Sequence, residues 1–282
     1  MPDEHLEAEL AARIDPWLEH MRWRADFAAW RERRLAQECY QEEHLASARA
    51  VAAPLAGKQV VDLGAGMGGF SVALAREGVH VAALEYNADY CGIVRLRGRR
   101  YDLDLPVVQA AGEAVPFPDE AVDLVCSWDV LEHVQDPRTV LREVHRVLRP
   151  GGALLLTVIN RCGFHDPHYH LPGLNWLPRP LAEAWIQRSA RGKEGSRFAD
   201  RQALSEMHYF TWGAWCRLAR EMGFQAKDLQ EKRLRAGTLS SRRPWRRRLR
   251  RIVRTLGVEL LVYRLARACY LPFFEVVLWK RS

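Results

Sequence analysis

The residues whose types and spacing most clearly suit ligand binding lie between Val60 and Ala75, in a run that reads V-V-D-L-G-A-G-M-G-G-F-S-V-A-L-A. A short apolar strand leads into a turn with four glycines, and the first turns of a helix follow. Glycine lets the backbone turn sharply and approach a bound molecule closely, because it has no Cβ. The pattern therefore predicts a loop that cradles a ligand.

Two ligand classes fit this loop, because G-A-G-M-G-G at 64–69 matches both G-x-G-x-x-G for dinucleotides and, with Asp62, the D-x-G-x-G-x-G pattern of S-adenosylmethionine (SAM) sites. Asp62 favours SAM, since a carboxylate would repel dinucleotide phosphates but attract an ammonium group and a sulfonium. An ordinary strand-to-helix turn is the structural alternative. The residues expected to hold SAM here are Asp62, Gly64, Ala65, Gly66 and Gly68.

The chain around this loop alternates short apolar strands with helical segments. The expected strands are 59–63, 79–85, 106–110, 121–127, 153–159, 224–229 and 273–280, and the expected helices are 68–77, 88–99, 136–148 and 211–222. Such alternation is typical of a mostly parallel sheet with helices on both faces. We therefore expect an α/β, Rossmann-like fold with a seven-stranded sheet, in which the glycine loop follows the first strand.

Three further segments depart from the alternation. Residues 1–55 read as an N-terminal helical lid segment, in which Asp15-Pro16 fits a helix start. Within the domain 56–282, insertions at 161–208 and 236–271 interrupt the pattern, and long insertions in compact folds are often lids or binding loops. We expect the first insertion to form a substrate lid and the second to form basic amphipathic helices.

Amino-acid composition limits the class of protein and its cellular compartment. With 282 residues, 48% of them hydrophobic, the chain can bury one substantial core. Six cysteines without a C-x-x-C pair, a polar start without a signal-peptide pattern and no 18-residue apolar run favour a cytoplasmic protein. The net charge of +7 is uneven, because eleven Lys or Arg and no acid lie between Lys232 and Arg254.

Motifs downstream of the glycine loop agree in order and spacing. They are Glu85 at the end of the second strand, P-F-P-D at 116–119, A-V-D-L-V-C-S-W-D-V-L-E-H-V at 121–134 and R-V-L-R-P-G-G at 146–152. Together they closely resemble the class I SAM-dependent methyltransferases, in the branch that acts on small molecules such as quinone precursors, sugars and natural products. The resemblance is strong over about residues 57–160.

The resemblance implies further cofactor contacts. Glu85, 21 residues beyond Gly64, would accept hydrogen bonds from the ribose hydroxyls, although it could instead cap the next helix beside Asn87. In the family, the loop after the third strand presents backbone groups to adenine, but Ala111 stands where an Asp is common. The remaining residues expected to contact SAM are Tyr86, Gly112, Glu113, Ala114 and Trp128.

The candidate catalytic residues are Asp129, His133 and His168. Methyl transfer to a hydroxyl needs a base, and Asp129 and His133 share a face if the turn between them is helical. His133 could equally be a packing or capping residue. His168, in the insertion beside His165, Asp166 and His170, is the rival base, and the crowded spacing with one carboxylate leads us to assign no metal ligand.

The basic stretch 242–267 combines arginines with apolar residues at helical spacing. This composition is typical of a helix on an anionic membrane surface, with RNA as the rival partner and a helix packed on the sheet as the structural alternative. The sequence thus predicts a cytoplasmic SAM-dependent methyltransferase, peripheral to the inner face of a membrane, that methylates oxygen of a small-molecule, sugar or lipid-linked acceptor. A quinone-type C- or O-methyltransferase, an RNA methyltransferase and a non-catalytic SAM-binding module are the alternatives.

Overall fold

The computed structural model of the chain describes residues 4–22, 24–189, 203–238 and 251–281. Part of the expected substrate lid, 190–202, lies outside the described residues. So do residues 239–250, which include the start of the basic stretch 242–267. The cofactor loop, both predicted histidine bases and the last helix of the second insertion are all described.

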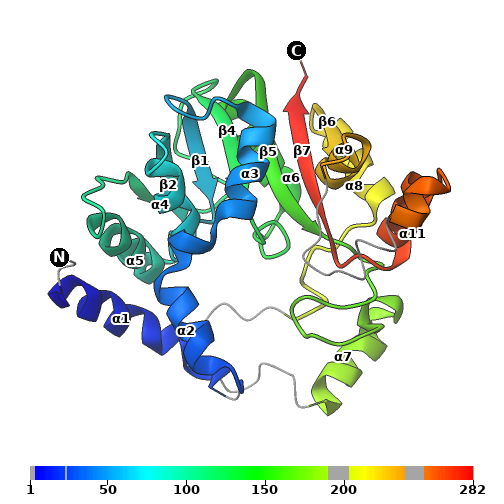
Figure 1. Cartoon of the computed structure of the whole chain (residues 1–282), viewed down its shortest axis with the longest axis horizontal. Helices are drawn as coiled ribbons and strands as arrows, with labels where there is room; N and C mark the ends of the chain where they lie inside the picture. Colours follow the sequence, from blue (N-terminus) through cyan, green and yellow to red (C-terminus); the bar gives the residue numbers. More distant parts are fainter. Residues whose placement is uncertain (1–3, 23, 190–202, 239–250, 282) are drawn as a thin grey trace. The chain divides into compact units, whose positions relative to one another are not determined.

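A seven-stranded sheet with the order β3-β2-β1-β4-β5-β7-β6 organises the chain (Figure 1). Strand β1 pairs in parallel with β2 and β4, and β2 pairs in parallel with β3. The predicted Rossmann-like fold is confirmed. The strand order reverses between β1 and β4, the place where such sheets bind ligands. The strands are β1 (Gln59–Leu63), β2 (His80–Glu85), β3 (Val107–Gln109), β4 (Val122–Ser127), β5 (Leu148–Ile159), β6 (Phe224–Asp228) and β7 (Phe273–Lys280).

Helices precede the sheet and connect its strands. The N-terminal segment contains α1 (Glu4–Leu18), η1 (Glu19–Met21), α2 (Phe27–Leu35), η2 (Gln37–Tyr40) and α3 (Glu42–Ala52). The remaining helices are α4 (Gly69–Ala75), α5 (Ala88–Arg99), α6 (Pro137–Val147), η3 (Leu174–Trp176), α7 (Arg179–Arg188), α8 (Trp212–Glu221), α9 (Leu229–Arg235) and α11 (Glu259–Cys269). Among the described residues, no helix has the length and hydrophobicity needed to cross a bilayer.

Two expected boundaries are wrong, and the other expected strand and helix bounds differ from the structure by at most two residues. Strand β5 begins at Leu148 rather than Ala153. Residues 149–151, which include a proline and a glycine, are exposed at the start of the strand, where both residue types are tolerated. Pro16 does not start a helix but lies inside the last turn of α1. The apolar side of α1 continues past it to Leu18, and Asp15 forms an ion pair with Arg31 instead of capping a helix.

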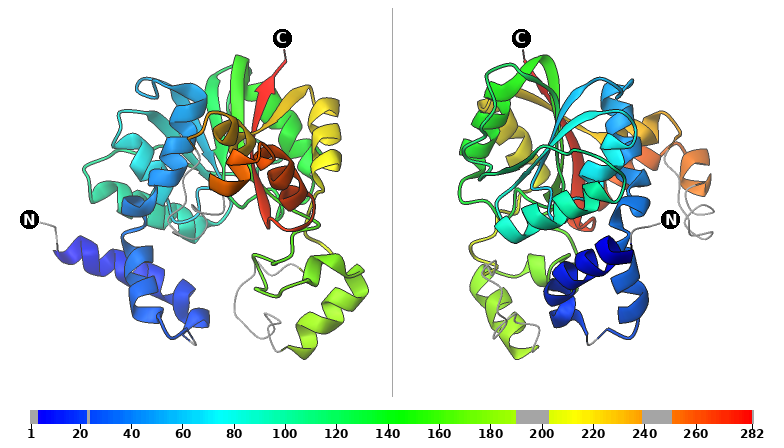
Figure 2. Two further views of the ribbon diagram at one scale, coloured as in Figure 1. Left: turned by 45° about the vertical axis from the view of Figure 1, so that its right-hand side comes forward. Right: turned by 90° about the vertical axis from the view of Figure 1, so that its left-hand side faces the viewer.

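Contacts between residues divide the chain into two compact units. Unit 1 comprises 1–130, 138–155 and 279–282, and unit 2 comprises 131–137 and 156–278. The N-terminal helices therefore cluster with the glycine loop in unit 1, and α1 packs along α5 (Figure 2, right view). Both insertions belong to unit 2.

Candidate functional site

The glycine loop between β1 and α4 has the backbone that its sequence predicts. Gly64, Gly66 and Gly68 have φ values of +73°, +55° and +79°, which favour glycine. A Cβ on Gly64 would overlap Val130, and one on Gly68 would lie 2.9 Å from the Val94 methyl carbons. A Cβ on Gly66 would meet no atom within 4 Å. Gly66 therefore faces open space, where a ligand can approach the backbone.

Glu85 joins the glycine loop to the start of α5. Its carboxylate, at the end of β2, accepts hydrogen bonds from the Gly66 N–H at 2.7 Å and from the Asn87 N–H at 2.9 Å. Asn87 then caps α5 by accepting from the Asp89 N–H. Glu85 thus supports the loop, and its contact with a ribose stays a prediction.

Asp62 turns toward the protein interior. Its side chain is 2% exposed, and Oδ2 accepts a hydrogen bond from Ser71 Oγ of α4 at 2.5 Å. Burial raises the pKa of Asp62 to about 7, and the charge of Glu85 acts in the same direction against the Ser71 hydrogen bond. In the structure Asp62 links β1 to α4, and its expected attraction to the ammonium group of SAM stays a prediction.

The other residues predicted to contact adenine are less enclosed. The Tyr86 side chain is 71% exposed, so its ring lines no closed pocket within unit 1. The Ala114 N–H donates to the Ala111 carbonyl at 3.1 Å. A Cβ on Gly112 would lie 3.4 Å from a Val140 methyl carbon and 3.6 Å from a Leu63 methyl carbon, which are ordinary contacts. The roles of Tyr86, Gly112, Glu113 and Ala114 in binding adenine stay predictions.

Trp128, directly after β4, stacks on a histidine that the sequence analysis missed. The ring centroids of Trp128 and His44 of α3 lie 4.2 Å apart at an angle of 19°, and Phe70 meets Trp128 edge-on at 5.7 Å. The Trp128 Nε1–H is buried without a hydrogen-bond partner among the described residues. A buried donor of this kind is costly unless a ligand satisfies it. This orphaned donor and the open side of Gly66 fit a bound SAM molecule.

Hydrogen bonds fix the protonation of His44. Gln41 Nε2 donates to the Gln37 carbonyl at 2.9 Å, so the amide oxygen of Gln41 faces His44 Nδ1, also at 2.9 Å. Nδ1 must therefore carry the hydrogen, which leaves a lone pair on Nε2. Burial lowers the pKa of His44, against the opposing charge of Asp129. His44 is thus a neutral imidazole beside Trp128.

The turn after Trp128 is not helical. Asp129 is exposed and has a φ of +55°, a value that non-glycine residues seldom adopt. Residues 131–133 form a turn, and α6 begins only at Pro137. The expected helical i, i+4 relation between Asp129 and His133 is therefore wrong. Strained residues of this kind cluster at functional sites.

Unit 2 brings the two predicted histidine bases together. His133 Nε2 and His168 Nε2 lie 3.1 Å apart, with the rings edge-on. His168 Nδ1 lies 3.2 Å from Tyr209 Oη, and Asp166, which is fully buried, accepts from the His168 N–H and orders its turn. We treated His133 and His168 as rivals, but the structure makes them partners. The two histidines are 35 residues apart in the sequence, and that spacing does not predict the contact.

Glu132 completes the cluster and was not assigned by the sequence analysis. Its Oε1 lies 3.6 Å from His168 Nε2 and 4.0 Å from His133 Nε2. The three ligand atoms all lie within 4.8 Å of one another, close enough to share one divalent cation. The cluster could therefore share a proton between its imidazoles or hold a divalent cation. Our expectation of no metal ligand counted only the residues of the insertion.

Comparisons with known proteins point to the methyltransferases. A family model described as a methyltransferase domain matches residues 61–156. A ubiquinone biosynthesis O-methyltransferase of Pseudomonas aeruginosa (strain UCBPP-PA14) is 33% identical over 63% of this chain and 68% of its own. A demethylmenaquinone methyltransferase of Clavibacter sepedonicus is 30% identical over 71% and 77%. With an Aeromonas salmonicida ubiquinone biosynthesis O-methyltransferase, the alignment spans 45% of the relative's length and 38% of this chain.

Solved structures share the fold. An S-adenosylmethionine dependent methyltransferase from Mesorhizobium loti aligns over 84% of this chain and 97% of its own, with 21% identity and a TM-score of 0.52. The [4+2]-cyclase SpnF aligns over 86% and 82%, with 15% identity and a TM-score of 0.51. At these identities the likeness shows the fold alone. The glycine loop, the family match and the two relatives aligned over two thirds or more of their length together show that this chain belongs to the class I SAM-dependent methyltransferases.

Proposed function

We propose that this protein transfers the methyl group of SAM to an oxygen of a small hydroxylated acceptor, most closely of the quinone-precursor type. The observation that carries the proposal is the contact between His133 and His168, two imidazoles that can accept a hydroxyl proton near neutral pH. One relative is named a ubiquinone biosynthesis O-methyltransferase and another a demethylmenaquinone methyltransferase. Both names support an acceptor of the quinone type, and the first supports transfer to oxygen.

The residues of the chain would divide the work as follows. Bound SAM supplies an electrophilic methyl group on a sulfonium. The glycine loop and Glu85 would hold the cofactor. The His133–His168 pair would accept the proton of the acceptor hydroxyl, which would remain on an imidazole. Alignment and removal of water supply the remaining acceleration.

Cofactor binding tests the first half of this proposal. We expect SAM to bind the wild type in calorimetry and Glu85→Ala to weaken binding by about 1–3 kcal/mol, because the loop and the ligand lose hydrogen bonds to a charged group. Asp89→Ala, an exposed acid in the next helix turn, is the matched control and should bind SAM normally. Binding of NAD in place of SAM would contradict the proposal.

The base is tested by methyl transfer to a catechol or hydroquinone acceptor. We expect His133→Ala or His168→Ala to lower kcat about 10²–10⁴-fold while SAM affinity is unchanged, because a general base contributes only to the chemical step. His165→Ala removes an exposed imidazole of the same insertion and should retain activity. Undiminished kcat in both variants would exclude the pair as the base.

A chelator separates the two readings of the cluster. If Glu132, His133 and His168 act through a shared proton, EDTA should leave kcat unchanged. If EDTA abolishes turnover and Mg²⁺ or Zn²⁺ restores it, the cluster orients and polarises the acceptor through a cation instead. SAM binding without turnover of any acceptor would favour a non-catalytic SAM-binding module.

A further inference from the structure

Helix α11 presents its apolar side chains to solvent. We define its apolar face, together with the helical residues 251–255 that precede it, by six side chains that are 37% to 67% exposed. They are Ile252, Leu256, Val258, Leu261, Val262 and Leu265. Isolated exposed leucines are common on proteins, but six large apolar side chains exposed within fourteen residues are not.

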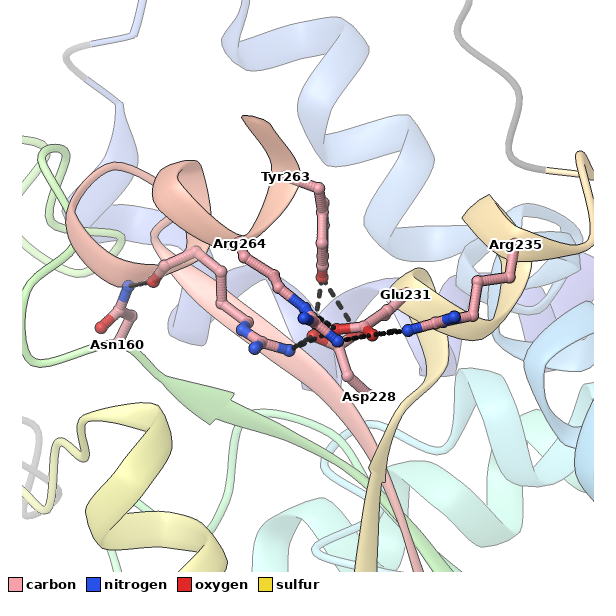
Figure 3. A network of polar contacts seen from close by, with 7 residues as sticks. Asn160, Asp228, Glu231, Arg235, Tyr263 and Arg264 are labelled. Atoms are coloured by element: carbon pink, nitrogen blue, oxygen red, sulfur yellow. Dashed lines mark hydrogen bonds and ion pairs between the residues drawn. The ribbon is translucent and has the colours of Figure 1, made fainter. Parts of the chain in front are cut away.

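The polar side of α11 faces the domain instead. Tyr263 donates a hydrogen bond to Asp228 at 2.8 Å, and the Arg267 guanidinium donates to Asp228 at 2.8 Å and to Glu231 at 3.1 Å. Arg264 reaches Glu231 at 2.8 Å. Figure 3 shows Tyr263 and Arg264 of α11 converging on the carboxylates of Asp228 and Glu231, which lie at the end of β6 and in α9. Asn160 also donates to the Arg267 carbonyl at 2.8 Å, which ties the helix to the end of β5.

The orientation of α11 is therefore inverted relative to an ordinary surface helix. At about 100° per residue, Leu261 and Leu265 lie on the opposite side of the helix from Tyr263 and Arg267. A surface helix of a soluble domain buries its apolar stripe and exposes its charges, whereas α11 buries Arg267, which is 8% exposed, and exposes its leucines. Because the tether is made of ion pairs and hydrogen bonds, the helix cannot simply rotate to hide them.

The charges next to this face in the sequence favour an anionic partner. The sequence from Arg242 to Arg254 carries eight arginines and no acid, and two of them, Arg251 and Arg254, are exposed in the described part. Apolar side chains flanked by arginines fit a bilayer that contains anionic phospholipid. The eleven residues of α11 span only about 16 Å at 1.5 Å per residue, about half of a bilayer core. The helix is suited to lie in the membrane interface.

We propose that the apolar face of α11 is a membrane-binding surface that inserts into the headgroup region of an anionic phospholipid bilayer. The tether to Asp228 and Glu231 holds this face outward before any lipid arrives. The surface would keep the protein at the membrane and bring it to acceptors dissolved there. This inference does not depend on the identity of the acceptor, because it concerns attachment of the full chain to lipid.

Vesicle flotation of the full-length protein tests the proposal. We expect binding to phosphatidylcholine vesicles that contain phosphatidylglycerol, weaker binding to phosphatidylcholine alone, and a decrease with added salt. Leu261→Gln with Leu265→Gln should lower the partition coefficient about tenfold or more, since two side chains no longer enter the lipid. SAM affinity should not change, which shows that the variant is folded and separates this result from the proposed catalysis.

A matched control localises the surface. Leu181 of α7 is 58% exposed, the same fraction as Leu261. Both are helical leucines, but α7 belongs to the first insertion and α11 to the second. Leu181→Gln should bind vesicles as the wild type does. Equal losses in both variants, or no loss in the α11 variant, would overturn the assignment. A dimer in ultracentrifugation that dissociates on Leu261→Gln would also overturn it, because a second copy would then cover the face.

Discussion

The N-terminal helical segment and α11 are both fastened by arginine–carboxylate networks, yet they present opposite faces to their surroundings. Arg97 of α5 pairs with Glu38 of η2, and both side chains are fully buried. Arg97 also donates to the carbonyls of Arg34 and Met67, so one guanidinium joins the N-terminal segment to the glycine loop. Arg267 makes comparable bonds between α11 and Asp228.

The apolar residues of the two segments have opposite fates. In α1, Leu6, Leu10, Ile14 and Leu18 are at most 8% exposed and pack with Ile93 and Leu96 of α5. In α11, the leucines of the apolar face stay in solvent. The N-terminal segment is therefore held by apolar packing and by charge together, whereas α11 is held chiefly by polar contacts on one side. Polar contacts on that side leave an apolar face for another partner.

The largest effect is expected from breaking the N-terminal network. Glu38→Gln should destabilise the protein by about 3–5 kcal/mol, because it leaves Arg97 buried without its counter-charge. Burial opposes the ionisation of Glu38, but Arg97 and Arg100 outweigh it and hold its pKa below the ordinary value. Denaturant unfolding measures the change. Glu7→Gln removes a partly exposed partner of Arg100 and should cost far less; equal costs would show that burial does not govern the network.

A leucine pair tests the difference in packing directly. Leu10→Ala should cost about 2–5 kcal/mol, because it leaves a cavity in a fully buried site. Leu261→Ala should change stability by no more than about 0.5 kcal/mol, as for exposed positions without specific contacts. Both are measured by denaturant unfolding of the full chain. A large cost for Leu261→Ala would mean that the apolar face of α11 is already covered in solution.

The smallest effect is expected at the exposed edge of the α11 network. The hydrogen bond from Arg264, opposed by burial, lowers the pKa of Glu231 to about 2 from an ordinary value of 4.5. A depressed carboxyl pKa stabilises the fold above pH 4.5, and this contribution is lost as the pH falls toward 2. Arg264→Gln should raise the pKa of Glu231 in an NMR titration and cost about 0.2–1 kcal/mol. An unmoved pKa would show that Arg264 is not its main partner.

Most of the fold could be predicted from the sequence, because strand and helix signals are local. The bounds of β1, β7 and α5 agree fully with the predicted ones. The errors occur where a local signal was overruled by packing, as at Pro16, which continues a helix whose apolar side is already buried. At β5, an exposed strand start accommodates the proline and glycines that we read as preceding the strand.

The sequence by itself determined the glycine loop, the order of the motifs and the class of cofactor, since turn chemistry and the ligand contacts it permits depend on neighbouring residues. Only the tertiary structure decided that His133 meets His168 across 35 residues of chain, that His44 stacks on Trp128, and that Asp62 is buried against Ser71. It also decided that α11 turns its leucines outward. These contacts follow from which elements pack together, and no local spacing encodes that choice.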